Sequence, residues 1–136
     1  MERIFYQKGY KYLLTRRYTV KLGFKSPYPF STRWFSFASD GTLTINSGYA
    51  WDGPSGPCPD FRWLMRPSLV HDTLYQAIRM GLLPPSFRRL ADAKLEEMAI
   101  EDGAGQAEAL IIFEAVDHFG ANYARRGTEP KELTAP

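Results

Sequence analysis

Residues 67–81 read Pro-Ser-Leu-Val-His-Asp-Thr-Leu-Tyr-Gln-Ala-Ile-Arg-Met-Gly, and this stretch decides the fold. Proline suits the first turn of a helix, where a backbone N–H has no partner to bond. Apolar side chains then recur three and four residues apart, as on one face of a helix. They are Leu69, Val70, Leu74, Tyr75 and Ile78. The stretch therefore predicts a helix that starts at Pro67, ends at Gly81 and buries one face.

Two more helices are expected after Pro84 and Pro85. Ser86 is a suitable N-cap for a helix that extends to Asp102. Its expected buried stripe consists of Leu90, Ala91, Leu95, Met98 and Ala99. A third helix is expected from Gln106 to Tyr123, and its stripe consists of Ala109, Ile112, Val116, Phe119 and Tyr123. We expect the first two of the three helices to lie antiparallel.

The N-terminal part of the chain favours strands. Lys11–Leu22 is rich in β-branched and aromatic residues with a partial alternation, which predicts one or two strands. Trp34–Ala38 and Thr42–Ile45 flank Ser39-Asp40-Gly41. Asp-Gly provides the positive φ angles that a tight hairpin turn needs. We therefore expect an antiparallel hairpin there, within a small antiparallel sheet.

A Gly- and Pro-rich segment separates the strands from the helices. Residues 48–66 also contain Tyr49, Trp51, Phe61 and Trp63, which argue for an ordered loop. Residues 1–126 are predicted to form a single α+β domain. Its expected parts are a β-rich part (1–47), the loop (48–66) and a helical part (67–126), followed by a flexible tail (127–136).

The composition excludes several classes of protein. A chain of 136 residues has room for one compact domain, and 44% hydrophobic residues exclude disorder over most of it. No apolar run reaches the roughly 20 residues that cross a bilayer. Met1–Tyr6 lacks the apolar region of a signal peptide. Cys58 is the only cysteine, so the chain can form no internal disulfide and fits a reducing compartment.

Charge is spread unevenly along the chain. Residues 1–40 carry eight Lys and Arg against two acids, and residues 41–136 carry nine against thirteen. A basic, aromatic front half is compatible with a surface for nucleic acid or lipid. It also suits a sheet with Tyr, Phe and Lys in cross-strand pairs, which we favour. Nucleic-acid binding ranks last among the functions considered, because no base-reading motif is present.

The candidate chemistry centres on His71 and Asp92. His71 lies on the helix face that packs inward, and Asp92 lies beside Ala91 and Leu95 on the buried seam of the next helix. A buried carboxylate needs a partner, and His71 is the expected one. Such a pair fixes the imidazole tautomer and leaves its other nitrogen able to take a proton from water. Tyr75 is placed to hydrogen-bond the same carboxylate. Alternatively, His71, Asp92 and Tyr75 only lock the two helices together.

Asp72 points about 100° away from His71 on the same helix. A carboxylate beside a loop with many unused backbone carbonyls is a candidate oxygen site for a hard cation such as calcium. Asp52 and Asp60 would add oxygen ligands there, or would only form turns. A hydrolase with a transition metal on His71, Asp72 and Asp52 also stays open, with His118 as the only other imidazole.

Asp52-Gly-Pro-Ser-Gly-Pro, followed by Val70-His-Asp-Thr-Leu-Tyr and by Ala91-Asp92, resembles a signature of tailed phages and prophages. That signature belongs to a domain of unknown function, and the likeness covers roughly residues 45–100. The resemblance implies a viral origin, and hence a place in the host cytoplasm or the virion. It implies no activity.

The same three blocks resemble the phospholipase A2 superfamily, including the compact versions of parvovirus capsids. In that superfamily a Gly-rich calcium loop precedes a helix with His-Asp-x-x-Tyr, and an Asp on an antiparallel helix orients the histidine. The resemblance implies that His71 is the general base, Asp72 a calcium ligand, and Tyr75 and Asp92 their support. It further implies that calcium is held by the carbonyls of Trp51, Gly53 and Ser55 and polarises the ester carbonyl.

Two functions are therefore expected as alternatives. One is a calcium-assisted hydrolase that acts on phospholipid or another ester. The other is a non-catalytic phage accessory or virion protein, which uses the same helix pair as a scaffold for a phage or host protein. Ser55 stands where the superfamily's loop has a glycine, and Trp51, Phe61 and Trp63 would face such a partner.

Overall fold

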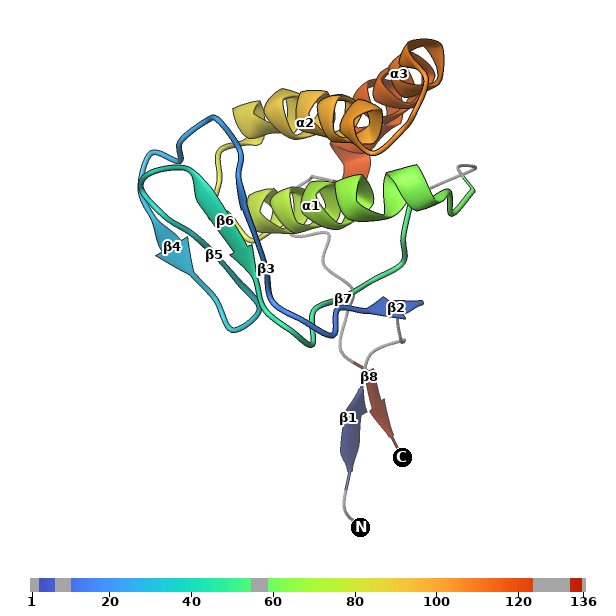
Figure 1. The fold of residues 1–136 in the computed structure, drawn as a ribbon. Helices are drawn as coiled ribbons and strands as arrows, with labels where there is room; N and C mark the ends of the chain where they lie inside the picture. Colours follow the sequence, from blue (N-terminus) through green and yellow to red (C-terminus); the bar gives the residue numbers. More distant parts are fainter. Residues whose placement is uncertain (1–2, 7–10, 55–58, 124–132, 136) are drawn as a thin grey trace.

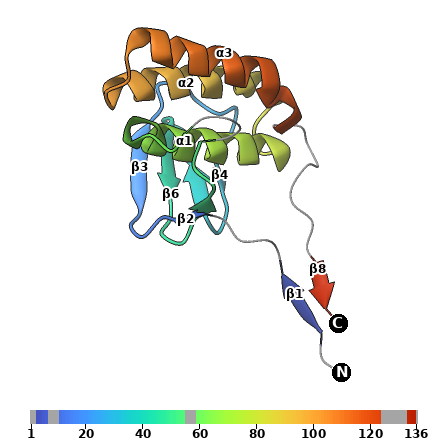
Figure 2. The ribbon, with the colours of Figure 1, turned by 90° about the vertical axis from the view of Figure 1, so that its right-hand side faces the viewer.

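The computed structural model describes residues 3–6, 11–54, 59–123 and 133–135. Figures 1 and 2 show three layers: a small sheet, then helix α1, then helices α2 and α3 on the other side of α1. The predicted α+β class, with antiparallel sheet before three helices, is confirmed. Helix α1, which carries His71, is thus covered from two sides.

The main sheet has four strands in the order β3–β6–β5–β4, with antiparallel neighbours throughout. Their bounds are Tyr18–Lys21 for β3, Phe30–Ser31 for β4, Phe35–Phe37 for β5 and Thr42–Ile45 for β6. The predicted hairpin is confirmed, with Phe37 opposite Leu43. Gly41 in its turn has φ +88°, and a Cβ there would lie 2.6 Å from the carbonyl oxygen of Phe24. The turn therefore requires glycine.

One face of the sheet forms the core with α1. The inward side chains of the central strands are at most 1% exposed; they are Phe35, Phe37, Leu43 and Ile45. They share one hydrophobic cluster with Leu69, Val70 and Leu74 of α1. Burial of each such side chain is worth about 1.5–3 kcal/mol. The sheet therefore fixes the rotation of α1 about its own axis, which turns the opposite face of α1 toward α2.

Helix α1 spans Arg62–Arg79, so the predicted start at Pro67 is wrong. Pro67 lies inside the helix and is buried. The earlier turn is held by Leu64, which is buried in a second cluster between the three helices, and by Trp63, which packs against that cluster. Packing of these two side chains offsets the backbone hydrogen bond that Pro67 cannot donate. The predicted end is confirmed, because Gly81 follows the helix with φ +74°.

Helix α2 spans Arg88–Glu101 and runs antiparallel to α1, as predicted (Figure 1). The prediction that Ser86 caps it is wrong. Ser86 lies in the 3-10 turn Pro85–Phe87, and α2 has no side-chain hydrogen bond at its N-cap. Leu90, predicted to be buried, is 41% exposed, because it lies about 100° around the helix from Ala91 and outside the stripe of buried residues. The rest of the stripe is buried as predicted, namely Ala91, Leu95, Met98 and Ala99.

Helix α3 spans Gln106–Tyr123, with the predicted bounds. Ala109 and Ile112 are buried in the second cluster, and Val116 packs against it. The side chains of Phe119 and Tyr123 lie outside the described part of the chain. Among the described helices, none has the length and apolar character to cross a membrane.

The predicted loop over residues 48–66 is shorter than expected. Strand β7 (Ala50–Trp51) pairs with β2 (Tyr12–Leu13), and the last residues of the segment belong to α1. Such two-residue strands carry no alternation that a sequence pattern could show. Lys11–Leu22 thus contributes two strands, β2 and β3, as predicted. Residues 55–58, including Ser55 and Cys58, lie outside the described residues.

The two ends of the described chain pair with each other. Strand β1 (Ile4–Tyr6) lies antiparallel to β8 (Leu133–Ala135), and both views show this ribbon apart from the layered body (Figures 1 and 2). Residues 133–135 of the predicted flexible tail form β8, whose backbone groups bond β1. Residues 127–132 and 136 of that tail lie outside the described residues.

Candidate functional site

His71 and Asp92 meet between α1 and α2, as the sequence predicts. The Nε2 atom of His71 lies 2.7 Å from Oδ1 of Asp92. Asp92 is 0% exposed and His71 is 7% exposed, so water does not compete for this contact. The sheet on one side of α1 and the α2 seam on the other hold the two side chains in place. Because Asp92 accepts, the neutral imidazole carries its proton on Nε2 and its lone pair on Nδ1.

Tyr75 supports the same carboxylate, also as predicted. Its hydroxyl donates to Oδ1 of Asp92 at 2.6 Å, and its ring lies 4.1 Å from the His71 ring, centroid to centroid. Burial, reinforced by this hydrogen bond to Asp92, raises the pKa of Tyr75. The hydroxyl therefore keeps its proton and stays a donor. Tyr75 and His71 together direct two donors at one oxygen of Asp92.

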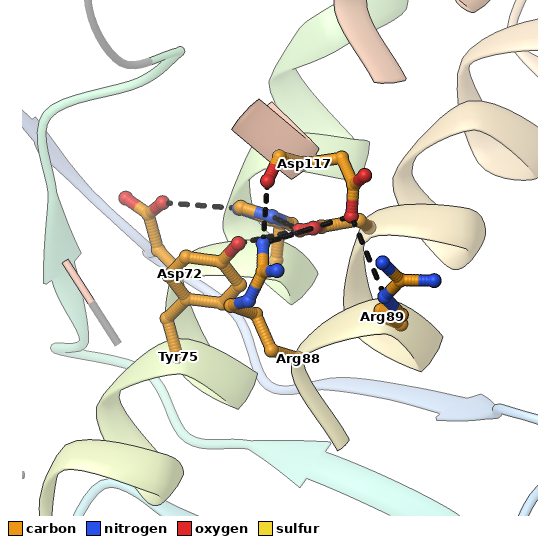
Figure 3. Close-up of polar contacts among 7 residues, drawn as sticks. Asp72, Tyr75, Arg88, Arg89 and Asp117 are labelled. Atoms are coloured by element: carbon orange, nitrogen blue, oxygen red, sulfur yellow. Dashed lines mark hydrogen bonds and ion pairs between the residues drawn. The ribbon is translucent and has the colours of Figure 1, made fainter. Parts of the chain in front are cut away.

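Arg88 supplies a third donor that sequence reasoning missed. Its Nη1 lies 3.2 Å from Oδ2 of Asp92. Asp92 follows Arg88 by one helical turn on α2. Figure 3 shows the Arg88 side chain reaching between Tyr75 and Asp117. The i, i+4 spacing of Arg88 and Asp92 was the available signal. It is easily read as a solvent-exposed pair, because most such pairs lie on helix surfaces.

The other nitrogen of His71 faces Asp72. Nδ1 lies 3.9 Å from Oδ1 of Asp72, which is too long for a direct hydrogen bond. Burial by itself lowers the pKa of His71, but Asp72 and Asp92 together outweigh it, so the pKa lies above its usual value. The imidazole is therefore a better proton acceptor than a free histidine. Nδ1 thus points toward Asp72, whose side chain is partly exposed to solvent.

Asp72 is half-buried at the edge of α1, where the sequence places it. Burial raises the pKa of Asp72, and the nearby charge of Asp52 adds to that rise, while His71 and Arg79 oppose it. A carboxylate whose charged form is disfavoured gains from a nearby cation. Without such a cation, burial favours the protonated form of Asp72.

A pocket opens beside His71 and Asp72. Its volume is about 290 Å³, including open solvent at its mouth. All three helices and the segment after β7 line it, through Pro54, Leu64, Ser68, His71, Asp72, Leu95, Ile112 and Val116. Apart from Ser68, His71 and Asp72 this lining is apolar. Most of the volume is open to solvent, and the enclosed part has room for about one water molecule beside the two polar groups.

The segment Trp51–Pro54 lies against α1 and reaches the pocket that Asp72 lines. The Trp51 indole is buried and donates to Oγ of Ser68 at 3.2 Å, which fixes the end of β7 against α1. Gly53 has φ +76°, and a Cβ there would lie 3.0 Å from the Tyr12 ring, so only glycine fits. Pro54 then lines the same pocket as Asp72.

Asp52 and Asp60 have other contacts in this segment. Oδ1 of Asp52 accepts a hydrogen bond from the backbone N–H of Lys11 at 3.0 Å. Asp60 accepts from the Tyr12 hydroxyl and from Nζ of Lys11, the latter at 2.9 Å. Asp60 therefore joins the end of the loop to β2 through Tyr12 and to the neighbouring Lys11. Of the two, only Asp52 acts on Asp72, through its charge.

The donor set beside the pocket fits a hard cation. Asp72 offers a carboxylate, and Trp51 and Gly53 offer carbonyls in the neighbouring segment, which are oxygen ligands of the kind calcium prefers. Ser55, the other expected carbonyl ligand, lies outside the described residues. Among the residues that the structure describes, no three His, Cys, Asp or Glu side chains gather as a metal site. A transition-metal site on His71, Asp72 and Asp52 thus finds no support there.

Comparisons with protein-family models, with curated proteins and with solved structures found no match for this chain. The likenesses to the phage domain and to the phospholipase A2 superfamily therefore remain predictions from the sequence.

Proposed function

We propose that this chain is a calcium-assisted, phospholipase A2-like hydrolase in which His71 activates water to cleave a lipid ester. One observation carries the proposal. A buried carboxylate holds one nitrogen of His71, while the other nitrogen faces Asp72 at an apolar pocket. A histidine that only joined the two helices would need the contact with Asp92. It would need neither the approach to Asp72 nor the pocket. The viral origin, with a place in the host cytoplasm or virion, is part of this proposal.

The chain's own residues divide the work. Nδ1 of His71 takes a proton from water, and the water oxygen attacks the ester carbonyl carbon. Asp92 stabilises the imidazolium that forms, with Tyr75 holding the carboxylate in position. The imidazolium then returns the proton to the leaving alkoxide, so that a fatty acid and an alcohol are released. Calcium bound at Asp72 with the carbonyls of Trp51, Gly53 and Ser55 would stabilise the oxyanion.

The test is release of fatty acid from mixed micelles of phosphatidylcholine and detergent, with calcium present. His71→Ala should lose activity by about a hundredfold or more, because the general base is removed. His118→Ala is the matched control, since His118 is the other histidine of the chain and lies exposed on α3. It should keep wild-type activity. A folded wild-type protein that releases no fatty acid contradicts the proposal.

A non-catalytic accessory protein is the second candidate. Two observations favour it: Asp92 is saturated by donors from both helices, and an exposed Phe61 stacks on Trp63 with ring centroids 4.8 Å apart. For such a protein, His71→Ala should lower the melting temperature without affecting any hydrolysis. The partner would be a phage or host protein that covers Phe61, and Phe61→Ala should abolish its binding.

A further inference from the structure

We infer that Arg88 is the positioning residue of the histidine–aspartate pair and that it connects the pair to α3. The inference rests on the proposed function for its catalytic consequence, but its structural part stands alone. Arg88 touches neither the pocket lining nor His71 in the contacts described. Its effect on chemistry therefore passes through Asp92.

The two oxygens of Asp92 have separate roles. Oδ1 accepts from His71 and Tyr75, which both belong to α1. Oδ2 accepts from Arg88. Because the two sets of donors pull on different oxygens, they fix the plane of the carboxylate. Oδ1 is thereby aimed at Nε2 of His71.

Arg88 also balances the charge of Asp92. An ionised carboxylate that is fully buried requires a compensating cation nearby. Arg88 is a permanent cation in direct contact with Asp92. With the charge of Asp92 balanced in this way, the imidazole of His71 can act as a neutral donor through Nε2–H.

Helix α3 holds Arg88 in place from the other side. Nη1 of Arg88 donates to the backbone carbonyl of Asp117 at 2.9 Å and lies 3.7 Å from the Oδ1 atom of the same residue. Figure 3 shows these contacts converging on the Arg88 guanidinium. The side chain of Arg88 is only 19% exposed, so its position is set by α2 and α3 together. The third helix therefore helps to orient a pair that lies on the first two.

The neighbouring residue provides a matched control. The Arg89 side chain is 79% exposed, and its Nε lies 4.0 Å from Oδ1 of Asp117. Arg89 has the same charge as Arg88 and is its direct neighbour on α2, but it has no described contact with Asp92. Arg89→Gln therefore removes one positive charge near α3 without touching the pair.

The first measurement is the proton NMR signal of the His71 Nε2–H, identified by its loss in His71→Gln. In Arg88→Gln, this signal should shift or be lost to exchange with water, because Asp92 is no longer fixed. In Arg88→Lys the signal should still be visible but shifted, since lysine keeps the charge but lacks the planar guanidinium whose Nη1 reaches both Asp92 and the Asp117 carbonyl. Arg89→Gln should retain the wild-type signal. An unchanged signal in both Arg88 variants overturns the inference.

The second measurement is the kinetics of phosphatidylcholine hydrolysis. Arg88→Gln should lower kcat about tenfold or more with little change in KM, and Arg88→Lys should restore part of kcat. Equal losses in Arg88→Gln and Arg89→Gln would mean a general charge effect and would overturn the inference. If Arg88→Gln does not fold, Arg88→Lys decides alone, and wild-type values of signal and kcat then refute the role of Arg88. A wild type without hydrolysis, together with a shifted signal in Arg88→Lys, supports the positioning role and refutes the proposed function.

Discussion

At the scale of single residues, the site depends on one buried carboxylate. Asp92 has no exposed surface, and three donors from α1 and α2 surround it. Loss of a donor to a buried charge costs more than loss of a neutral surface hydrogen bond. Each donor of Asp92 should therefore contribute measurably to the stability of the helix pair, whatever the activity.

Replacement of Tyr75 by Phe measures one of these donors. The substitution removes the hydroxyl that donates to Oδ1 of Asp92 and leaves the ring in the core. It should lower the free energy of unfolding by about 1.5–3 kcal/mol, measured by urea denaturation. Tyr28→Phe is the control, because Tyr28 is exposed, and its effect should stay within about 0.5 kcal/mol. Equal effects of the two substitutions would show that the Tyr75 contact adds nothing.

The pH dependence of stability follows from His71. Its pKa is raised in the folded protein, because Asp72 and Asp92 outweigh the opposing effect of burial. The folded state therefore binds the His71 proton more tightly than the unfolded state does, so the contribution of this proton is complete below the unfolded pKa of about 6.5. It is lost as pH rises through the folded pKa.

Urea denaturation of wild type and His71→Asn over about pH 6 to pH 9 measures this contribution. The stability advantage of the wild type should shrink as pH rises, since the variant has no imidazole to titrate. Burial also raises the pKa of Asp72, but this carboxyl is present in both proteins that are compared. An advantage that stays constant or grows with pH contradicts the interpretation of His71.

At the scale of elements, periodicity predicted the parts that carry the site. The helical spacing around His71 and around Asp92 marked two buried faces, and a charged group on one buried face requires a partner on the other. This reasoning predicted the contact of His71 with Asp92 and that of Tyr75 with Asp92. The Asp-Gly turn predicted the hairpin, because few other residues tolerate its backbone angles.

Other elements were beyond sequence reasoning for physical reasons. Helix α1 extends through Pro67 because Trp63 and Leu64 pack between the helices, and this tertiary contact has no local signal. Ser86 caps nothing, since the chain enters α2 through a 3-10 turn. Arg88 was missed because an arginine at a helix start is usually solvated, and only the position of α3 shows that it is not.

The hairpin turn offers a test at this scale. Gly41 and Gly23 both have positive φ, but a Cβ would clash with the Phe24 carbonyl only at Gly41 and would meet nothing within 4 Å at Gly23. Gly41→Ala should therefore destabilise the protein by about 1–3 kcal/mol more than Gly23→Ala does, measured by denaturation. Equal costs would mean that the turn relaxes around the added methyl group.

At the scale of the whole molecule, three layers meet at the site. The sheet fixes the rotation of α1, α2 carries the carboxylate, and α3 contributes pocket lining and holds Arg88. Strand β7 adds the backbone segment beside Asp72 through the Trp51 contact with Ser68. A short helix pair alone would lack the apolar wall of the pocket. The front half of the chain therefore serves the site by placing α1 and the segment that ends at Pro54.

The measurement that tests the central claim most directly is the initial rate of fatty-acid release at rising free calcium, set by a chelator buffer. We expect wild type to gain activity with calcium, His71→Ala to stay inactive at every concentration, and Asp72→Asn to need far more calcium. A wild-type rate that remains at the level of His71→Ala across the whole calcium range, with all three proteins folded, would contradict the account.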